Sequence, residues 1–220
     1  MYCEDLAYIH DRGYSDGAAR AATWIVHMLR TKHRSGGRLL DLGCVGATAV
    51  FSRAGYETLG MDISRSMVHL ARRRVPHGKS RVASFLLIRP FHGPPSWRPA
   101  RSSITLPSAD VGFAFDVRMP PRKDDPLTWV TGKIGTDWSV MSGRVVDMNR
   151  RILIRSITTL RLVRGRWRRG QEIHRQRLYR PSDIRAWLRV AGFHIERRSG
   201  YDEIPLSTGA LFIASKPGAP

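Results

Sequence analysis

The chain has 220 residues, enough for one domain with a buried core, and 42% of them are hydrophobic. It contains no run of about 18 apolar residues, and its amino terminus lacks a basic segment followed by an apolar one. We therefore expect neither a membrane span nor an export signal. Its two cysteines are too few for a disulfide framework and lack metal-ligand spacing. We therefore expect a cytoplasmic protein with no metal and no membrane partner.

The formal net charge of +19 would ordinarily point to nucleic acid or an anionic surface. However, the basic residues are 32 arginines and 5 lysines, spread along the whole chain. A GC-rich genome produces this bias without selection for binding, and no basic patch is interleaved with aromatic residues. We expect salt-sensitive, non-specific attachment to nucleic acid but no specific nucleic-acid partner.

The first predicted element is a helix from about Asp16 to Arg30. Its apolar residues recur at intervals of three and four, which is typical of a helix with one buried face. The inward positions would be Ala18, Ala22, Ile25, Val26 and Leu29. The stretch Tyr8-Ile-His-Asp-Arg-Gly-Tyr14 comes directly before this helix.

The next residues predict a strand, a tight turn, a helix and a second strand. Leu39 to Leu42 is a short apolar run before Gly43, and a helix from about Ala47 to Arg53 precedes a strand from Tyr56 to Met61, with Asp62 at its end. Such a βαβ unit brings the turn and the acidic residue together at the edge of a parallel sheet where ligands bind. A carboxylate there can accept from the two ribose hydroxyls. The pattern therefore predicts a nucleoside-containing cofactor.

These residues also resemble a known family. The segments Asp41-Leu-Gly-Cys44, Ala54-Gly-Tyr56, Gly60-Met-Asp-Ile-Ser64 and Met67 to Arg72 resemble the first two motifs of class I methyltransferases that use S-adenosylmethionine. The resemblance is to a bacterial, small-molecule branch. It implies an α/β fold with a Rossmann-like sheet, helices on both faces, S-adenosylmethionine as the cofactor and a small molecule as the methyl acceptor. An α/β domain with a glycine turn and no ligand is the alternative.

The resemblance further implies a set of cofactor-binding residues: Tyr14, Asp41, Gly43, Cys44, Gly46, Asp62, Ile63, Ser84 and Phe85. In this set Asp41 and Gly43 would shape the methionine end of the site, Asp62 would hold the ribose, and Ser84 and Phe85 would meet the adenine. The loop departs from the family because Val45 stands where a second glycine is usual, and its Cβ is expected to crowd the cofactor.

After Asp62, Ser64 is the predicted N-cap of a helix from Arg65 to Arg74, and Ser80 to Leu86 predicts a third strand. The following residues, 87–110, predict no regular structure, and Leu87 to Pro107 alone contains five prolines. The family places its fourth strand and a helix here, so the sequence predicts that this strand is missing. We hypothesise that the segment is a frameshifted remnant, which the nucleotide sequence would test.

Regular patterns return at Val111 to Val117, which resembles the fifth strand of the fold. Three long segments rich in Val, Ile and Thr then predict a three-stranded antiparallel meander with one face over the substrate pocket: Trp138 to Val146, Arg151 to Val163 and Trp167 to Tyr179. Ser182 is the predicted cap of a helix from Asp183 to Val190, and Phe193 to Arg198 and Ala210 to Ala214 are the closing strands.

The whole chain is predicted to form a single domain, 1–220. It would comprise an N-terminal lid helix (1–36), a cofactor-binding core (37–86), the irregular segment (87–110), and the fifth strand, the inserted β-meander and the C-terminal strands (111–220). No internal repeat is present in the sequence.

Two histidines are the candidate catalytic residues. His174 shares a strand face with Gln176 and Leu178, and as an imidazole it could take a proton from the acceptor. His10, before the first helix, could also touch the acceptor; a structural role is the alternative for both. Three functions are open: a small-molecule methyltransferase, an inactive or decayed methyltransferase-like protein acting by binding if at all, and an RNA methyltransferase.

Overall fold

The structure is a computed structural model, and it describes residues 2–31, 36–44, 46–76, 78–83, 103–106, 111–202, 204–206 and 208–216. Within these ranges the core is a seven-stranded mixed sheet with the order β10-β13-β5-β4-β1-β2-β3. Its strands are β1 Arg38–Leu42, β2 Glu57–Asp62, β3 Lys79–Val82, β4 Ser103–Leu106, β5 Val111–Arg118, β10 His194–Arg198 and β13 Gly209–Lys216. β1, β2 and β3 run parallel, as the βαβ pattern predicts.

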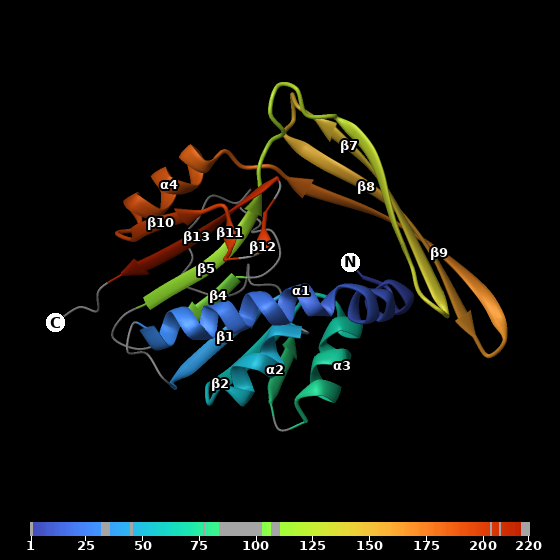
Figure 1. Ribbon diagram of the computed structural model, residues 1–220, viewed down its shortest axis with the longest axis horizontal. Coiled ribbons are helices and arrows are strands. Elements are labelled where there is room, and N and C mark those ends of the chain that lie inside the picture. Colours follow the sequence, from blue (N-terminus) through green and yellow to red (C-terminus); the bar gives the residue numbers. More distant parts are fainter. Residues whose placement is uncertain are drawn as a thin grey trace.

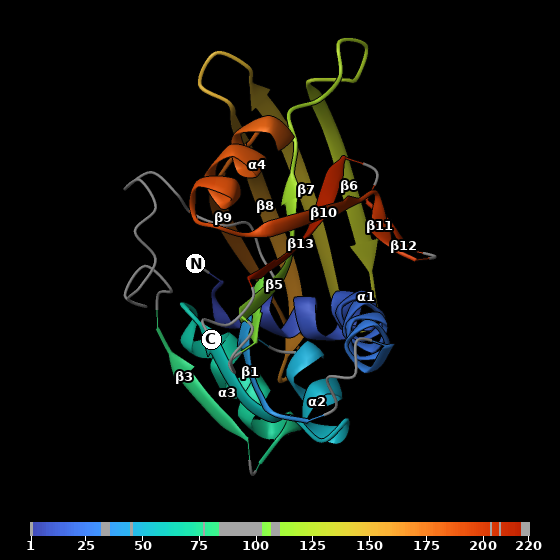
Figure 2. The ribbon, with the colours of Figure 1, turned by 90° about the vertical axis from the view of Figure 1, so that its left-hand side faces the viewer.

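Helices cover both faces of this sheet, as predicted. α1 (Glu4–Thr31), α2 (Gly46–Arg53) and α3 (Arg65–Arg74) lie on one face, and α4 (Pro181–Val190) lies on the other (Figure 1 and Figure 2). The side chains of β13 show why both faces are covered, because they alternate between two apolar clusters. Leu211 packs on the α1 side, and Phe212 packs on the α4 side.

α1 begins at Glu4, so the predicted start at Asp16 is wrong by three turns. The additional turns bury Leu6 and Ile9 against residues that follow much later in the chain. Gly13 lies inside the helix rather than at its end. It leaves room for a neighbour, because a Cβ at this position would lie 2.8 Å from the Trp138 ring. Long-range packing therefore extends the helix beyond its local signal.

A strand fills the place where the sequence predicts none. β4 lies between β1 and β5 and is antiparallel to both, with Ser103 opposite Leu42. The prediction that the sheet lacks a strand here is therefore wrong. However, β4 runs antiparallel to β1, whereas a strand connected by a βαβ crossover would run parallel to it. The other residues of the irregular segment, 87–102 and 107–110, lie outside the described residues, and the frameshift hypothesis stays a prediction.

The inserted meander has four strands in the described part of the chain, one more than predicted. They are β6 Thr128–Ile134, β7 Trp138–Asp147, β8 Ile152–Val163 and β9 Arg166–Arg177, paired in that order. β6 was missed because Gly132 and Lys133 interrupt its apolar pattern. The meander rises from the core as a separate curved layer, and its far end lies over the first turns of α1 (Figure 1).

The other predicted elements agree with the structure within a few residues, but the predicted cap of α4 is wrong and two short strands were not predicted. Met67 donates from its backbone N–H to Ser64 Oγ at 3.4 Å, which confirms Ser64 as the N-cap of α3. Ser182 is not the cap of α4: the N-cap is Arg180, with no side-chain cap bond, because Pro181 already occupies the first turn. β11 (Gly200–Tyr201) and β12 (Ile204–Pro205) form a separate two-stranded sheet. Among the described helices, none is long and apolar enough to cross a membrane.

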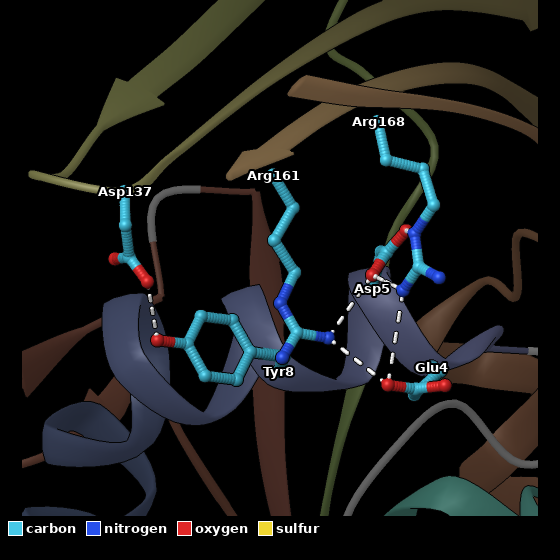
Figure 3. Close-up of polar contacts among 6 residues, drawn as sticks. All are labelled: Glu4, Asp5, Tyr8, Asp137, Arg161 and Arg168. Carbon is cyan, nitrogen blue, oxygen red and sulfur yellow. Dashed lines mark hydrogen bonds and ion pairs between the residues drawn. The ribbon is translucent and has the colours of Figure 1, made fainter. Parts of the chain in front are cut away.

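Polar contacts fix the meander to the first turns of α1. Asp5 is buried and accepts hydrogen bonds from Arg161 of β8 at 3.0 Å and from Arg168 of β9 at 2.7 Å (Figure 3). One turn further along, the Tyr8 hydroxyl donates to Asp137 at 2.6 Å, while the Arg161 guanidinium lies 3.9 Å from the Tyr8 ring centroid. These contacts hold the inner face of the meander at a fixed place over α1.

Candidate active site

A tight turn joins β1 to α2 at the carboxyl edge of the parallel strands. Gly43 has a φ of 82°, a conformation that favours glycine. The backbone N–H groups of Gly43 and Cys44 donate to the Met61 carbonyl at 2.8 and 3.2 Å. The turn is therefore tied to the end of β2, so that Gly43 and Asp62 lie close together, as the motif spacing predicts.

Asp41 supports this turn from inside the protein. Its side chain is only 1% exposed, and it accepts a hydrogen bond of 2.5 Å from Thr48 Oγ1 in α2. Burial raises its pKa to about 6, against a partly opposing effect of the Thr48 hydrogen bond. Asp41 therefore joins β1 to α2, and this position suits the expected role of shaping the site.

Replacing Asp41 by asparagine should change how stability depends on pH. The folded-state pKa of Asp41 lies above its unfolded value, so the parent protein loses stability as pH rises from about 4 to about 7. Asparagine still accepts from Thr48 but has no charge to bury. We expect the stability of the variant relative to the parent to rise by about 2 kcal/mol between these pH values.

Urea denaturation of both proteins at several pH values would measure this difference. The exposed Asp124→Asn variant is the matched control, and its stability relative to the parent should stay constant over the same interval. A difference between Asp41→Asn and the parent that is the same at pH 4 and pH 7 would contradict the prediction.

Asp62 stands at the end of β2, beside the turn. The Ser64 N–H donates to Asp62 Oδ1 at 2.7 Å, which orients the carboxylate while leaving it further acceptor capacity. Burial raises the pKa of Asp62, and the Ser64 bond opposes this. Ile63, the next residue, is 52% exposed at the same edge. By contrast, Cys44 is fully buried, and this burial raises the pKa of its thiol.

Residues of α1 and residues directly before it lie close to this edge at two places, the start of α2 and the residues that follow β2. A Cβ at Gly46 would lie 3.1 Å from the Ser15 carbonyl, so α1 passes close to the start of α2 just after Tyr14. At the other half, the Ser64 hydroxyl donates to the Tyr2 carbonyl at 2.9 Å. Tyr14 and Tyr2 therefore border the edge at which Gly43 and Asp62 lie.

These two tyrosines also line a cavity of about 190 Å³ between α1 and the inner face of the meander. His10 lies between their rings, with its centroid 5.4 Å from Tyr2 and 5.7 Å from Tyr14. The opposite wall includes Ser142 and Arg144 of β7 and Arg155 and Ile157 of β8. The prediction that one face of the meander covers a pocket agrees with this arrangement.

The two candidate catalytic histidines differ in their contacts. His174 Nδ1 lies 3.3 Å from Arg155, and its Nε2 lies 2.7 Å from Glu172. Because arginine only donates, Nδ1 must accept, and the ring proton then sits on Nε2 and is donated to Glu172. Burial lowers the pKa of His174, as it does for His10. Of the two, His10 alone has a buried Nδ1 without a partner among the described residues.

Sequence reasoning missed the arginines of this cavity. Arg144 and Arg155 stand opposite each other on β7 and β8, and Arg118 at the end of β5 lies close enough for their charges to act on it. Burial, and then the neighbouring guanidinium groups, lower the pKa of Arg118. The available signal was that Arg144 and Arg155 occupy the inward positions of strands whose other inward residues are mostly apolar.

Three of the residues discussed in the sequence cannot be placed. Val45, Ser84 and Phe85 lie outside the described residues. The crowding by Val45 and the contact of Ser84 and Phe85 with adenine therefore stay predictions.

The arrangement of strands and helices is shared with solved methyltransferases. A S-adenosylmethionine-dependent methyltransferase from Clostridium acetobutylicum ATCC 824 superposes with a TM-score of 0.72 at 12% identity, covering 97% of this chain and 98% of that one. DesVI from Streptomyces venezuelae gives 0.70 at 18% identity, with coverage of 99% and 100%. The chain has the methyltransferase fold. No protein-family model and no curated protein matches the sequence.

A third structure with the methyltransferase fold is CalS10, an amino pentose methyltransferase from Micromonospora echinaspora that takes part in calicheamicin biosynthesis. It superposes with a TM-score of 0.66 at 17% identity and covers 98% of both chains. These identities are low, so the likeness concerns the fold. It includes the meander and α1, because nearly the whole chain is covered in each comparison.

The residues at the edge of the methyltransferase fold suit S-adenosylmethionine. The turn at Gly43 brings backbone close to the ligand edge, and the Asp62 carboxylate has acceptor capacity left for a ribose diol. The exposed Ile63 offers an apolar surface next to that carboxylate. The aromatic ring of Tyr14, 46% exposed, borders the opposite half of the edge.

Proposed function

We propose that the chain transfers a methyl group from S-adenosylmethionine to a small-molecule acceptor. The observation that carries the proposal is that the cavity under the meander borders the Gly43 and Asp62 edge on two sides. Of the cavity residues, Tyr14 lies at this edge next to the start of α2 at Gly46, and Tyr2 is joined to it by the hydrogen bond from the Ser64 hydroxyl to the Tyr2 carbonyl. An acceptor in the cavity would therefore lie next to a cofactor at the edge. CalS10, which has the same fold, acts on an amino pentose.

S-adenosylmethionine supplies a methyl group on a sulfonium sulfur, ready for in-line displacement by a nucleophile. The chain contributes mainly position and the exclusion of water. Asp62 accepts from the ribose hydroxyls, the turn at Gly43 shapes the methionine end, and Tyr14 closes over it. Ser84 and Phe85 are the proposed adenine contacts.

His10 is the proposed base. Its ring lies between Tyr2 and Tyr14 in the cavity wall, and its Nδ1 is buried without a partner among the described residues. Burial lowers the pKa of His10, so the ring is neutral at physiological pH and can take the proton that the acceptor loses. In this proposal His174 holds the Arg155 guanidinium through its Nδ1 and is itself held by Glu172.

Calorimetric titration of the full chain with S-adenosylmethionine and S-adenosylhomocysteine tests the proposal. We expect both to bind with micromolar dissociation constants. A labelled methyl group should then pass from the cofactor into a metabolite extract rather than into RNA. A folded chain that binds neither compound would contradict the proposal and favour a protein that has lost this activity.

A further inference from the structure

The cavity between α1 and the meander has the chemistry of an anion site. Its lining contains two arginines, Arg144 and Arg155, and no carboxylate among the described residues. The two stand directly opposite each other on adjacent strands, a placement that is unfavourable for like charges in the absence of a partner. Arg118 at the end of β5 is close enough for the charges of this pair to act on it, and burial followed by these charges lowers its pKa.

Several hydrogen-bonding atoms in this lining are buried and have no partner among the described residues. They are Arg144 Nε, Arg155 Nε, Ser142 Oγ and His10 Nδ1. Native proteins leave few such atoms unsatisfied, so a gathering of them in the lining of one cavity is typical of a site for a polar ligand. Three of the four can donate a hydrogen bond, which indicates that the ligand presents acceptors.

Neighbouring side chains hold both arginines in place without neutralising them. His174 accepts from Arg155 Nη2 at 3.3 Å, and the Arg144 guanidinium lies 5.6 Å from the Trp129 ring centroid. Two neighbouring carboxylates already have partners: Glu172 accepts from His174 and from the Cys3 N–H, and Asp116, whose charge acts on Arg118, accepts from the Tyr201 hydroxyl. Among the described residues, no ion pair engages Arg144 or Arg155.

We propose that this cavity binds an oxyanion group of the methyl acceptor, a carboxylate or a phosphate, through Arg144, Arg155 and Ser142. Guanidinium groups donate two hydrogen bonds in one plane, which suits both of these groups. The inference rests on the proposed function for the identity of the ligand as the acceptor, because the cavity borders the cofactor edge at Tyr14 and Tyr2. Arg118 strengthens the local positive potential without lining the cavity.

Calorimetric titration with glucose and two of its anionic derivatives tests the site without any methyl transfer. Glucose 6-phosphate carries a phosphate, gluconate carries a carboxylate, and glucose carries neither. The full chain should bind at least one of the two anionic compounds at least about tenfold more tightly than glucose at low salt. The difference between the two anions would then show which oxyanion the site prefers. Equal binding of all three, or no binding of either anion at millimolar concentration, would overturn the proposal.

Arginine variants separate the site from the general positive charge of the chain. Arg144→Gln and Arg155→Gln should each weaken anion binding by about tenfold. Arg175→Gln is the matched control, because Arg175 is exposed on the opposite face of β9, one residue after His174, and its loss should change binding less than about twofold. An equal loss in the control would assign binding to net charge and overturn the proposal.

A second titration distinguishes failure of this inference from failure of the proposed function. S-adenosylmethionine should bind Arg144→Gln and Arg155→Gln as it binds the parent, which also shows that the variants are folded. Anion binding that depends on these arginines in a chain that does not bind S-adenosylmethionine would retain the site and remove the methyl donor. If the parent binds S-adenosylmethionine but neither arginine variant changes anion binding, the methyl donor is retained and the anion site is overturned.

Discussion

Replacing Asp62 by alanine is expected to weaken the binding of S-adenosylmethionine by about ten- to hundredfold. The reason is the loss of a charged acceptor for the ribose hydroxyls, which contributes roughly 1.5 to 3 kcal/mol. The Ser64 N–H, 2.7 Å from Asp62 Oδ1, would also lose its partner. Asp62→Asn separates these two effects, because an amide oxygen can still accept from Ser64 while the charge is absent. Its affinity should lie between those of the parent and of Asp62→Ala.

Glu57→Gln provides the matched control for this prediction. Glu57 begins the same strand, β2, at the end away from the proposed cofactor edge, and pairs there with Lys79 in solvent. Removing its charge should leave the affinity within about twofold of the parent. The measurement is calorimetric titration with S-adenosylmethionine and S-adenosylhomocysteine. If Asp62→Ala binds both as tightly as Glu57→Gln does, Asp62 does not hold the ribose.

The elements around Asp62 were predictable because their signals are local. The glycine at the turn, the apolar run of β1 and the N-cap Ser64 each act within a few residues of their own position. β1, α2, β2 and α3 accordingly begin and end within one residue of their predicted bounds. The chain neighbours of these residues determine most of their conformation, so the sequence pattern is sufficient.

The first three turns of α1 were not predictable in this way. Leu6 and Ile9 are buried by Trp138 and Ile157, which follow about 130 and 150 residues later in the chain. No periodic pattern near the amino terminus reports such partners, and Gly13 and Gly17 lower the helix propensity of this stretch. The cavity could not be predicted for the same reason, because Arg144 and Arg155 are far from His10 in the sequence and become its neighbours only when the meander lies over α1.

Replacing Asp5 by alanine is expected to lower the free energy of unfolding by about 3 kcal/mol, because it removes the acceptor that joins α1 to the meander. Asp5 is 6% exposed and bonds two arginines, and the Arg161 side chain, itself only 18% exposed, would lose the closer of its two carboxylate partners. Glu4→Ala is the matched control. Glu4 contacts the same arginines, but its side chain is 73% exposed, so its loss should cost less than about 0.5 kcal/mol.

Urea denaturation of the parent, Asp5→Ala and Glu4→Ala at several pH values would test this contrast. Burial by itself would raise the pKa of Asp5, but the hydrogen bonds from Arg168 and Arg161 outweigh it and lower the pKa. A carboxyl with a lowered folded-state pKa contributes its full stability above its unfolded value of about 4 and loses it as pH falls further. The gap between parent and Asp5→Ala should therefore be constant from pH 8 to about pH 5 and narrow below about pH 4. Equal costs for the two variants, or a gap that widens in acid, would show that Asp5 does not fasten the meander over the cavity.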